Sequence, residues 1–243
     1  MIKQTIFTAS QDLSKPALTG LLTKVHEGLL EIVAIDGFRI AYRAQKGEYM
    51  CSVQGTQDAP KTHLHRVSAI IPAKTMGEIA KLAGNEDITL HMADGKVLFQ
   101  MENCIAVSRL LEGNFIDYEK LLAVESIVTV KLNRKELLEA VGRACLISDE
   151  NNKRLPVKLD ISNGVIKISS KGSMDSMNEE IAVVTEGGNL AVGFNPRYII
   201  EALKAIESDE ITITFGGALK PCVITPAEGD ESKHLVLPLR LQS

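Results

Sequence analysis

His63 and His65 flank a single leucine, so both imidazoles would lie on one face of an extended segment. Such a pair could supply half of a metal site, and a metal-dependent enzyme is therefore one function class to consider. A catalytic zinc ion normally needs a third protein ligand, and the chain carries no H-E-x-x-H, G-x-S-x-G or phosphate-loop motif. His26, His91 and His234 have no motif partners. We interpret the pair as exposed loop histidines and expect neither a metal nor another cofactor.

Carboxylates are plentiful, but the sequence pairs them with lysines, so no acid–base dyad can be named. The 31 acidic and 27 basic residues leave a formal net charge of −4, which excludes a global basic field that would draw the chain onto nucleic acid or anionic lipid. The chain has no apolar run of about 18 residues and no signal-peptide pattern at its start, so we expect no membrane association and a cytoplasmic location. The four cysteines form no C-x-x-C pair and are expected to be buried thiols in a reducing compartment.

Three predicted helices share a charge pattern, in which two cations two turns apart have a carboxylate between them. A solvated helix face with local ion pairs is the simpler interpretation of each helix. The recurrence favours another one, a set of helices that offers sparse positive charge to one long anion through weak, salt-sensitive phosphate contacts. The sequence leaves both open. The three sets are Lys74, Glu78 and Lys81; Lys135, Glu139 and Arg143; and Arg197, Glu201 and Lys204.

The last apolar run, residues 235–241, reads LVLPLRL and has the apolar density of a strand. Pro238 lies in its middle and cannot donate a hydrogen bond to a sheet, which places the run at a sheet edge. An edge strand with leucines on both faces is a candidate docking surface. A buried strand remains the alternative, because apolar strand residues are mostly core.

The elements that must position these residues follow from hydrophobic periodicity and turn signals. Asn133 is the expected N-cap of one helix, and Pro196 the first residue of another. Hairpin turns are expected at residues 36–37, 93–95 and 162–164, which each end in glycine. The expected helices are 74–83, 134–145 and 196–206. The expected strands are 18–24, 29–35, 38–44, 67–72, 87–92, 96–101, 104–111, 127–132, 157–161, 165–169, 179–186, 190–194, 211–215, 222–225 and 235–241.

One unit recurs along the chain: strand, amphipathic helix, acidic turn, strand, hairpin, strand. It covers residues 69–111, 127–169 and 191–241, and the strings AGNEDITL at 83–90 and IESDEITI at 206–213 match closely. Such a repeat predicts a duplicated α+β architecture with helices on one face of antiparallel sheets. The polar stretch near the middle of the chain predicts two domains, residues 1–122 and 123–243.

With these elements in place, the chain resembles the beta subunit of bacterial DNA polymerase III, the beta sliding clamp. The resemblance implies the DNA-clamp fold, with antiparallel sheets on the outside and paired helices on the inner face. The family has three similar domains, and this chain looks like the second and third, with the opening strand of the second missing. The matching segments are 16–20 (PALTG), 33–40 (VAIDGFRI), 111–118 (LEGNFIDY), 194–198 (FNPRY) and 237–241 (LPLRL).

The resemblance implies a non-catalytic processivity factor that tethers the replicative polymerase to duplex DNA without reading its sequence. The family is usually classified with the DNA-directed DNA polymerases. Implied partners are the polymerase III alpha subunit, the clamp loader, and other polymerases and repair proteins that carry a short Leu/Phe motif. The head-to-tail homodimer of the family would be impaired here. The alternative is a protein-interaction scaffold of clamp-like fold that does not encircle DNA.

The resemblance also implies a hydrophobic pocket between the second and third domains that binds the partner motif, roughly Gln-Leu-x-Leu-Phe. Ile35 stands where the family usually has Thr, and Phe38 where it has His or Tyr, so this pocket would be more apolar. The expected DNA-facing residues are Lys74, Lys81, Lys135, Arg143, Arg197 and Lys204. The expected pocket residues are Leu18, Ile35, Gly37, Phe38, Arg39, Ile40, Ile116, Lys120, Leu121, Asn195, Tyr198, Leu219, Pro221, Leu235, Val236, Leu237, Pro238, Leu239 and Arg240.

Overall fold

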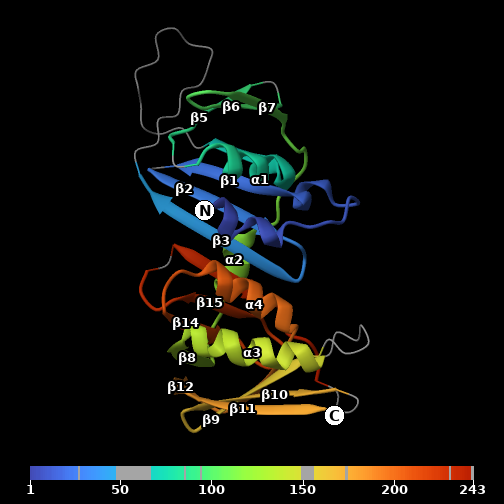
Figure 1. Cartoon of the computed structure of the whole chain (residues 1–243), viewed down its shortest axis with the longest axis vertical. Helices are drawn as coiled ribbons and strands as arrows, with labels where there is room; N and C mark the ends of the chain where they lie inside the picture. Colours follow the sequence, from blue (N-terminus) through green and yellow to red (C-terminus); the bar gives the residue numbers. More distant parts are fainter. Residues whose placement is uncertain are drawn as a thin grey trace. The chain divides into compact units, whose positions relative to one another are not determined.

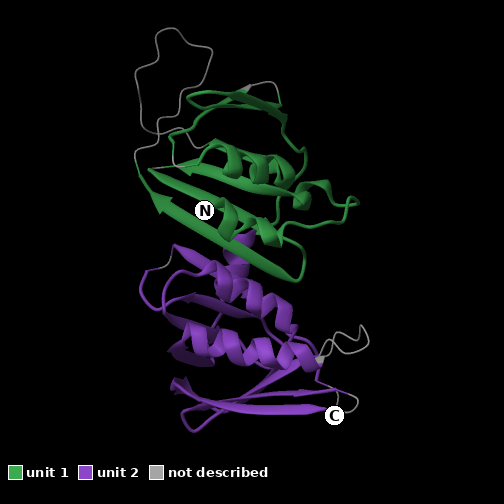
Figure 2. Cartoon of the chain, viewed as in Figure 1, with its two compact units in different colours: residues 1–116 green, residues 117–243 purple. Residues whose placement is uncertain are grey.

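The computed structural model describes residues 1–26, 28–47, 67–84, 86–93, 95–148, 156–172, 175–229 and 231–241. Within these residues the chain forms two compact units, 1–116 and 117–243, coloured separately in Figure 2. His63, His65 and Cys51 lie outside the described residues. None of the described helices has both the length and the apolarity needed to cross a membrane.

In the described part of unit 1, one α-helix, α1 (Ala73–Leu82), packs against two antiparallel sheets. The helix buries Met76 and Ile79 in a core that also takes Ile71 from one sheet and Phe99 from the other. Three 3-10 turns, η1 (Ile2–Gln4), η2 (Ile6–Thr8) and η3 (Pro16–Thr19), precede the strands. The first sheet has the order β3 (Arg39–Lys46), β2 (Leu29–Ile35), β1 (Gly20–His26), β4 (Val67–Pro72). The second has the order β5 (Thr89–Ala93), β6 (Lys96–Gln100), β7 (Ile105–Arg109).

Unit 2 has the same kind of architecture with two adjacent long helices, α3 (Arg134–Ser148) and α4 (Pro196–Ala205), after a short α2 (Tyr118–Leu122) (Figure 1). Aliphatic residues of both long helices and both sheets form one core, with Phe194 and Phe215 at a centroid distance of 6.3 Å inside it. One sheet has the order β12 (Val184–Gly187), β8 (Val128–Asn133), β14 (Glu210–Phe215), β15 (Cys222–Pro226), β16 (Ser232–Val236). The other has the order β11 (Ser176–Ala182), β10 (Val165–Lys171), β9 (Val157–Ser162), β13 (Leu190–Phe194).

The predicted helix starts and hairpins are confirmed by local geometry. The Asn133 side chain accepts hydrogen bonds from the backbone N–H groups of Lys135 (2.9 Å) and Glu136 (3.2 Å), and thereby caps α3. Asn195 caps α4 by accepting from the Arg197 N–H at 3.0 Å. The β9–β10 hairpin turns through Asn163 and Gly164 at φ +50° and +77°, the left-handed conformations that a type I′ turn requires. These features depend on near neighbours in sequence, which is why the sequence predicts them.

The single strand expected at 179–186 and the expected burial of every cysteine are wrong. Residues 179–186 were predicted as one strand, but β11 ends at Ala182 and β12 starts at Val184 in the other sheet of unit 2. The Val183 N–H makes the last bond to the sheet of β11, to the Gly164 carbonyl at 2.8 Å, and the chain then enters the other sheet. The alternation of apolar and polar residues cannot show which sheet a strand joins. The cysteines also differ from the expected buried set. Cys222 is buried, and its burial raises the pKa of the thiol to about 12, but Cys104 is exposed.

Glu31 is a buried carboxylate in unit 1 with two side-chain partners. It accepts hydrogen bonds from the Tyr42 hydroxyl at 2.7 Å and from the imidazole Nε2 of His26 at 2.9 Å. Burial alone would raise the pKa of Glu31, but the bonds from Tyr42 and His26 outweigh it and lower the pKa. The ionised carboxylate therefore stabilises unit 1.

Tyr42→Phe removes one of these bonds, and we expect it to lower the free energy of unfolding by about 1–2 kcal/mol at neutral pH. The pKa of Glu31 is lower in the folded chain than in the unfolded one. Its contribution is therefore complete above the unfolded-state pKa and is lost as the pH falls through the folded-state pKa. Urea unfolding at a series of pH values should show the difference between variant and parent shrinking in acid. A difference that stays constant with pH would contradict this.

Candidate functional site

The C-terminal segment leaves the sheet earlier than predicted. The expected strand 235–241 is wrong beyond Val236, where β16 ends, because Pro238 has no N–H to donate to a strand ladder. Leu235 and Val236 are buried, whereas Leu237 is 37% exposed. The segment is then held again at Leu239, whose N–H donates to the Gly193 carbonyl of β13 at 2.8 Å. Residues 237–241 thus lie on the surface of unit 2, fixed at one point.

Gly193 allows this close approach. A Cβ at this position would lie 2.7 Å from Leu241 Cδ2 and 3.1 Å from the Leu239 carbonyl oxygen, closer than ordinary contact. The glycine side of β13 therefore provides the space that the C-terminal segment occupies.

Gly193→Val should displace residues 239–241 from β13, because the added side chain and the segment cannot occupy the same space. Trypsin cleavage after Arg240, followed by mass spectrometry, should be faster in this variant than in the parent. Gly188→Val is a matched control, since a Cβ at Gly188 meets nothing within 4 Å. Equal cleavage rates for the two variants would show that the contact at Gly193 does not hold the segment.

The other predicted pocket residues of unit 2 lie at the ends of neighbouring elements. The register Cys222↔Val236 places Pro221 beside Leu237, and Leu219 is 73% exposed in the loop 216–221 that precedes it. Asn195 follows Gly193 by two residues and is buried at the start of α4, where its side chain is used as the cap. The loop, the C-terminal segment and the start of α4 therefore converge. We call this region the tail surface, defined by Tyr198, Leu219, Pro221, Leu237, Pro238, Leu239 and Arg240.

Two predicted residues of unit 2 lie on α2. Leu121 is exposed, and Lys120 is exposed with its ammonium 2.6 Å from the Asp117 carboxylate. The hydrogen bond from Lys120 to Asp117 raises the pKa of the lysine. Neither residue is part of the hydrophobic core of unit 2.

The predicted residues of unit 1 divide into buried and exposed groups. Leu18, Ile35 and Ile40 are buried, whereas Phe38 is 57% exposed and Ile116 is also exposed. The exposed turn between β2 and β3 contains Gly37, which has a φ of +94°, and Phe38.

Arg39, the residue expected to orient polar groups, is mostly buried and makes internal contacts. Its Nε lies 2.8 Å from the Asp36 carboxylate, and its guanidinium donates to the Phe7 carbonyl at 3.0 Å. The Asp36 carboxylate also accepts from the backbone N–H groups of Phe38 and Arg39 and so fixes the turn. Arg39 therefore ties the hairpin to the N-terminal segment of unit 1.

All six predicted DNA-facing cations are exposed on α1, α3 and α4. Lys81 lies 2.9 Å from Glu78 on its own helix, Lys135 lies 3.1 Å from Asp209, and the Arg143 Nε donates to Glu179 at 3.0 Å. Such exposed pairs contribute little stability, so these cations can exchange partners at small cost. Within the described part of the chain, no ion pair is recorded for Lys74 or Lys204.

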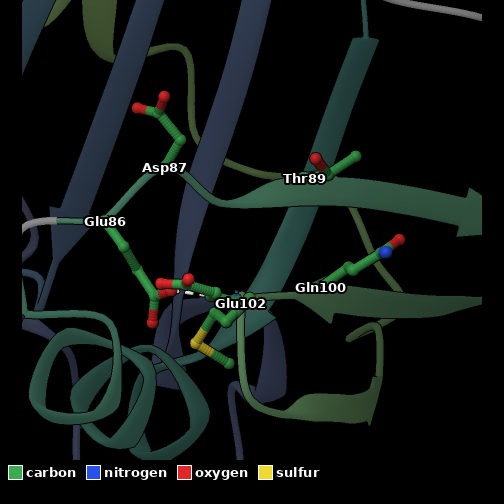
Figure 3. Close-up of a pocket in the computed structure, with 6 residues that line it drawn as sticks. Glu86, Asp87, Thr89, Gln100 and Glu102 are labelled. Carbon is green, nitrogen blue, oxygen red and sulfur yellow. Dashed lines mark hydrogen bonds between the residues drawn. The ribbon is translucent and has the colours of Figure 1, made fainter.

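Unit 1 also has a cavity of about 330 Å³ that the sequence analysis did not single out (Figure 3). Its lining is acidic, and the Glu86 carboxylate accepts a hydrogen bond from the Glu102 backbone N–H at 2.8 Å. The acidic turn of the repeat was the sequence feature that could have indicated this cavity. The described ranges contain no cluster of three or more side chains arranged to hold a metal. The lining residues are Glu86, Asp87, Thr89, Gln100, Met101 and Glu102.

Comparison with known proteins gives matches along almost the whole chain. The family model for the central domain of the DNA polymerase III beta subunit matches residues 1–117, and that for the C-terminal domain matches residues 120–240. The beta sliding clamps of Staphylococcus epidermidis and Staphylococcus aureus are both 32% identical over 99% of this chain. The chain spans 61% of the length of these curated relatives.

Solved structures give the same result for the fold. The sliding clamp of Bacillus subtilis superposes with a TM-score of 0.88 at 31% identity, over 99% of this chain and 61% of that one. The DNA polymerase III beta subunit of Thermotoga maritima gives 0.87 at 28% identity, over 99% and 62%. A Pseudomonas aeruginosa sliding clamp bound to griselimycin gives 0.87 at 27% identity, over 99% and 62%. The duplicated α+β fold predicted from the sequence is thereby confirmed.

Proposed function

Because this chain belongs to the beta-subunit family of DNA polymerase III, the beta sliding clamps, we propose that it acts in DNA replication as a non-catalytic clamp that tethers a polymerase to duplex DNA. The match of two successive domain models along almost all of its length carries this proposal. Its partners would be duplex DNA, the polymerase III alpha subunit, the clamp loader, and other polymerases and repair proteins, whereas the head-to-tail homodimer of the family would be impaired in this chain.

We propose that partners bind through a short segment with Leu and Phe anchors, and that the tail surface contacts these anchors. Leu219 and Leu237 of this surface are exposed apolar side chains, and Pro221, Pro238 and Tyr198 are half-buried. Covering such side chains contributes roughly 25 cal/mol per Å² of apolar area, which favours an apolar segment over a charged one. Arg240 is exposed at the end of the same segment and can orient a carboxylate or carbonyl of the partner. Phe38, Ile116 and Leu121 are further exposed apolar residues of the predicted set.

The double variant Leu219→Asp/Leu237→Asp should weaken binding of a fluorescent peptide containing Gln-Leu-x-Leu-Phe by about tenfold or more, because it removes two exposed apolar contacts and buries charge on binding. Fluorescence anisotropy measures the affinity. Leu13→Asp is the control, since Leu13 is 82% exposed on unit 1 outside the predicted set. Unchanged affinity in the double variant would reject the tail surface as the binding site.

The six helix cations would contact DNA phosphates without reading bases. Lys74→Glu/Lys204→Glu changes the two cations for which the described residues show no ion pair. We expect the dependence of log K on log salt for a short duplex to become shallower by about 2, since each phosphate contact contributes about −0.9 to the slope.

Lys15→Glu/Lys171→Glu is the charge-matched control, because both lysines are exposed and lie on neither α1 nor α4. If both double variants bind duplex DNA like the parent, the helix cations do not face DNA. That outcome would favour the interaction scaffold without a DNA role.

A further inference from the structure

The C-terminal segment of unit 2 has a counterpart in unit 1, the segment that follows β7. In each unit, a leucine N–H of this segment donates to the strand that precedes the helix, from Leu111 to Ile70 and from Leu239 to Gly193, both at 2.8 Å. Ile70 and Gly193 each lie three positions before the first residue of their helix, α1 or α4. The two strands and the two segments can therefore be compared residue by residue.

Large and small residues are exchanged between the two copies. In unit 1 the strand has Ile70, and the segment has Gly113 two positions after its bonded leucine. In unit 2 the strand has Gly193, and the segment has Leu241 two positions after its bonded leucine. The large aliphatic side chain thus belongs to the strand in one copy and to the segment in the other.

Leu241 lies directly on Gly193 and takes the space that a side chain of the strand would need. A Cβ on this glycine would be 2.7 Å from Leu241 Cδ2 and 3.2 Å from Leu241 Cγ. We call the space on this side of Gly193, bordered by the Leu239 carbonyl, the glycine notch. Ile70 is buried at the matching position of unit 1, whereas Leu241 is exposed. The glycine notch therefore holds a leucine side chain that solvent still reaches.

Leu241 can leave the glycine notch while its neighbour stays in place. The backbone bond to Gly193 comes from Leu239, two residues earlier, so it does not depend on the Leu241 side chain. An exposed leucine buries only part of its apolar area, so its removal costs less than removal of a core leucine. The side chain also regains rotamer freedom when it is released. A second leucine could therefore take the same place.

We propose that Leu241 is an internal competitor of the partner segment. In the free chain it fills the glycine notch, and a leucine anchor of the partner replaces it on binding. This inference rests on the proposed function, in which a segment with Leu and Phe anchors binds the tail surface, because Leu239 of that surface borders the notch. Leu241 stays tethered beside the notch at a high effective concentration, so it lowers the apparent affinity for the partner and refills the notch when the partner leaves.

Nuclear magnetic resonance of the whole chain with isotope-labelled leucine methyl groups tests the exchange directly. The free chain should show a nuclear Overhauser effect between the Leu241 methyl groups and the Gly193 Hα protons. A saturating amount of a peptide containing Gln-Leu-x-Leu-Phe should remove this effect. When the peptide leucines carry the label instead, an intermolecular effect from one of them to the Gly193 Hα protons should appear.

A substitution tests the competition by affinity. Leu241→Ala should tighten binding of the fluorescent peptide by about threefold or more, because the apparent Kd falls as the fraction of chain with an empty notch rises. Leu146→Ala is the matched control, since it shortens an exposed leucine of α3 outside the tail surface, and it should leave the affinity unchanged. In Gly193→Ala the added methyl group fills the notch, so Leu241→Ala should have no effect in that background.

Two results would overturn this inference and leave the proposed function intact. One is peptide binding that is unchanged or weaker in Leu241→Ala, and the other is a contact between Leu241 and Gly193 that persists at saturating peptide. In both cases the peptide would still bind, without using the glycine notch. A parent chain and a Leu241→Ala variant that both fail to bind the peptide would instead reject the proposed binding at the tail surface, and the competition with it.

Discussion

The packing of a helix against two antiparallel sheets is the constraint on which each unit depends. A chain with only 4% aromatic residues fills most of its core with aliphatic side chains, and it buries them by packing the apolar faces of helices and sheets against one another. In unit 1, Met76 and Ile79 of α1 meet both sheets, and in unit 2, Ile199 and Leu203 of α4 do the same. The repeat in the sequence follows from this packing, because each copy must place the same apolar positions toward the core.

The two copies differ where the chain leaves the common scaffold. After the last strand of each unit, a leucine N–H donates to the strand that precedes the helix, from Leu111 to Ile70 in unit 1 and from Leu239 to Gly193 in unit 2, both at 2.8 Å. A β-branched side chain stands at this point in unit 1 and a glycine in unit 2. The β5–β6 connection is also short, whereas the β14–β15 loop extends over residues 216–221 and exposes Leu219. Small local changes thus produce a distinct surface on one of two similar units.

The features that could be predicted from the sequence are those that depend on residues close together in the chain. The caps at Asn133 and Asn195 and the turn at Asn163 and Gly164 depend on a few adjacent residues, and the repeat depends on periodicity. The change of sheet at Val183 depends on distant partners, so alternation could not show it. The end of β16 at Val236 has a local cause in Pro238, but the apolar density of residues 235–241 led to the prediction of a longer strand. The candidate site shows the same division. Ile35 and Phe38 lie three residues apart in the chain, yet one is buried and the other exposed, and only the three-dimensional packing separates them.

The pairing of helix cations with carboxylates affects how a clamp would move. If Lys81 and Lys135 contact DNA as proposed, the approach of a phosphate would make each ammonium exchange one anionic oxygen, about 3 Å away in Glu78 or Asp209, for another. The net energy of each exchange is small, so no register along a uniform polyanion is favoured over the next one. These carboxylates of the chain itself would therefore keep the free-energy differences between successive positions along the double helix small.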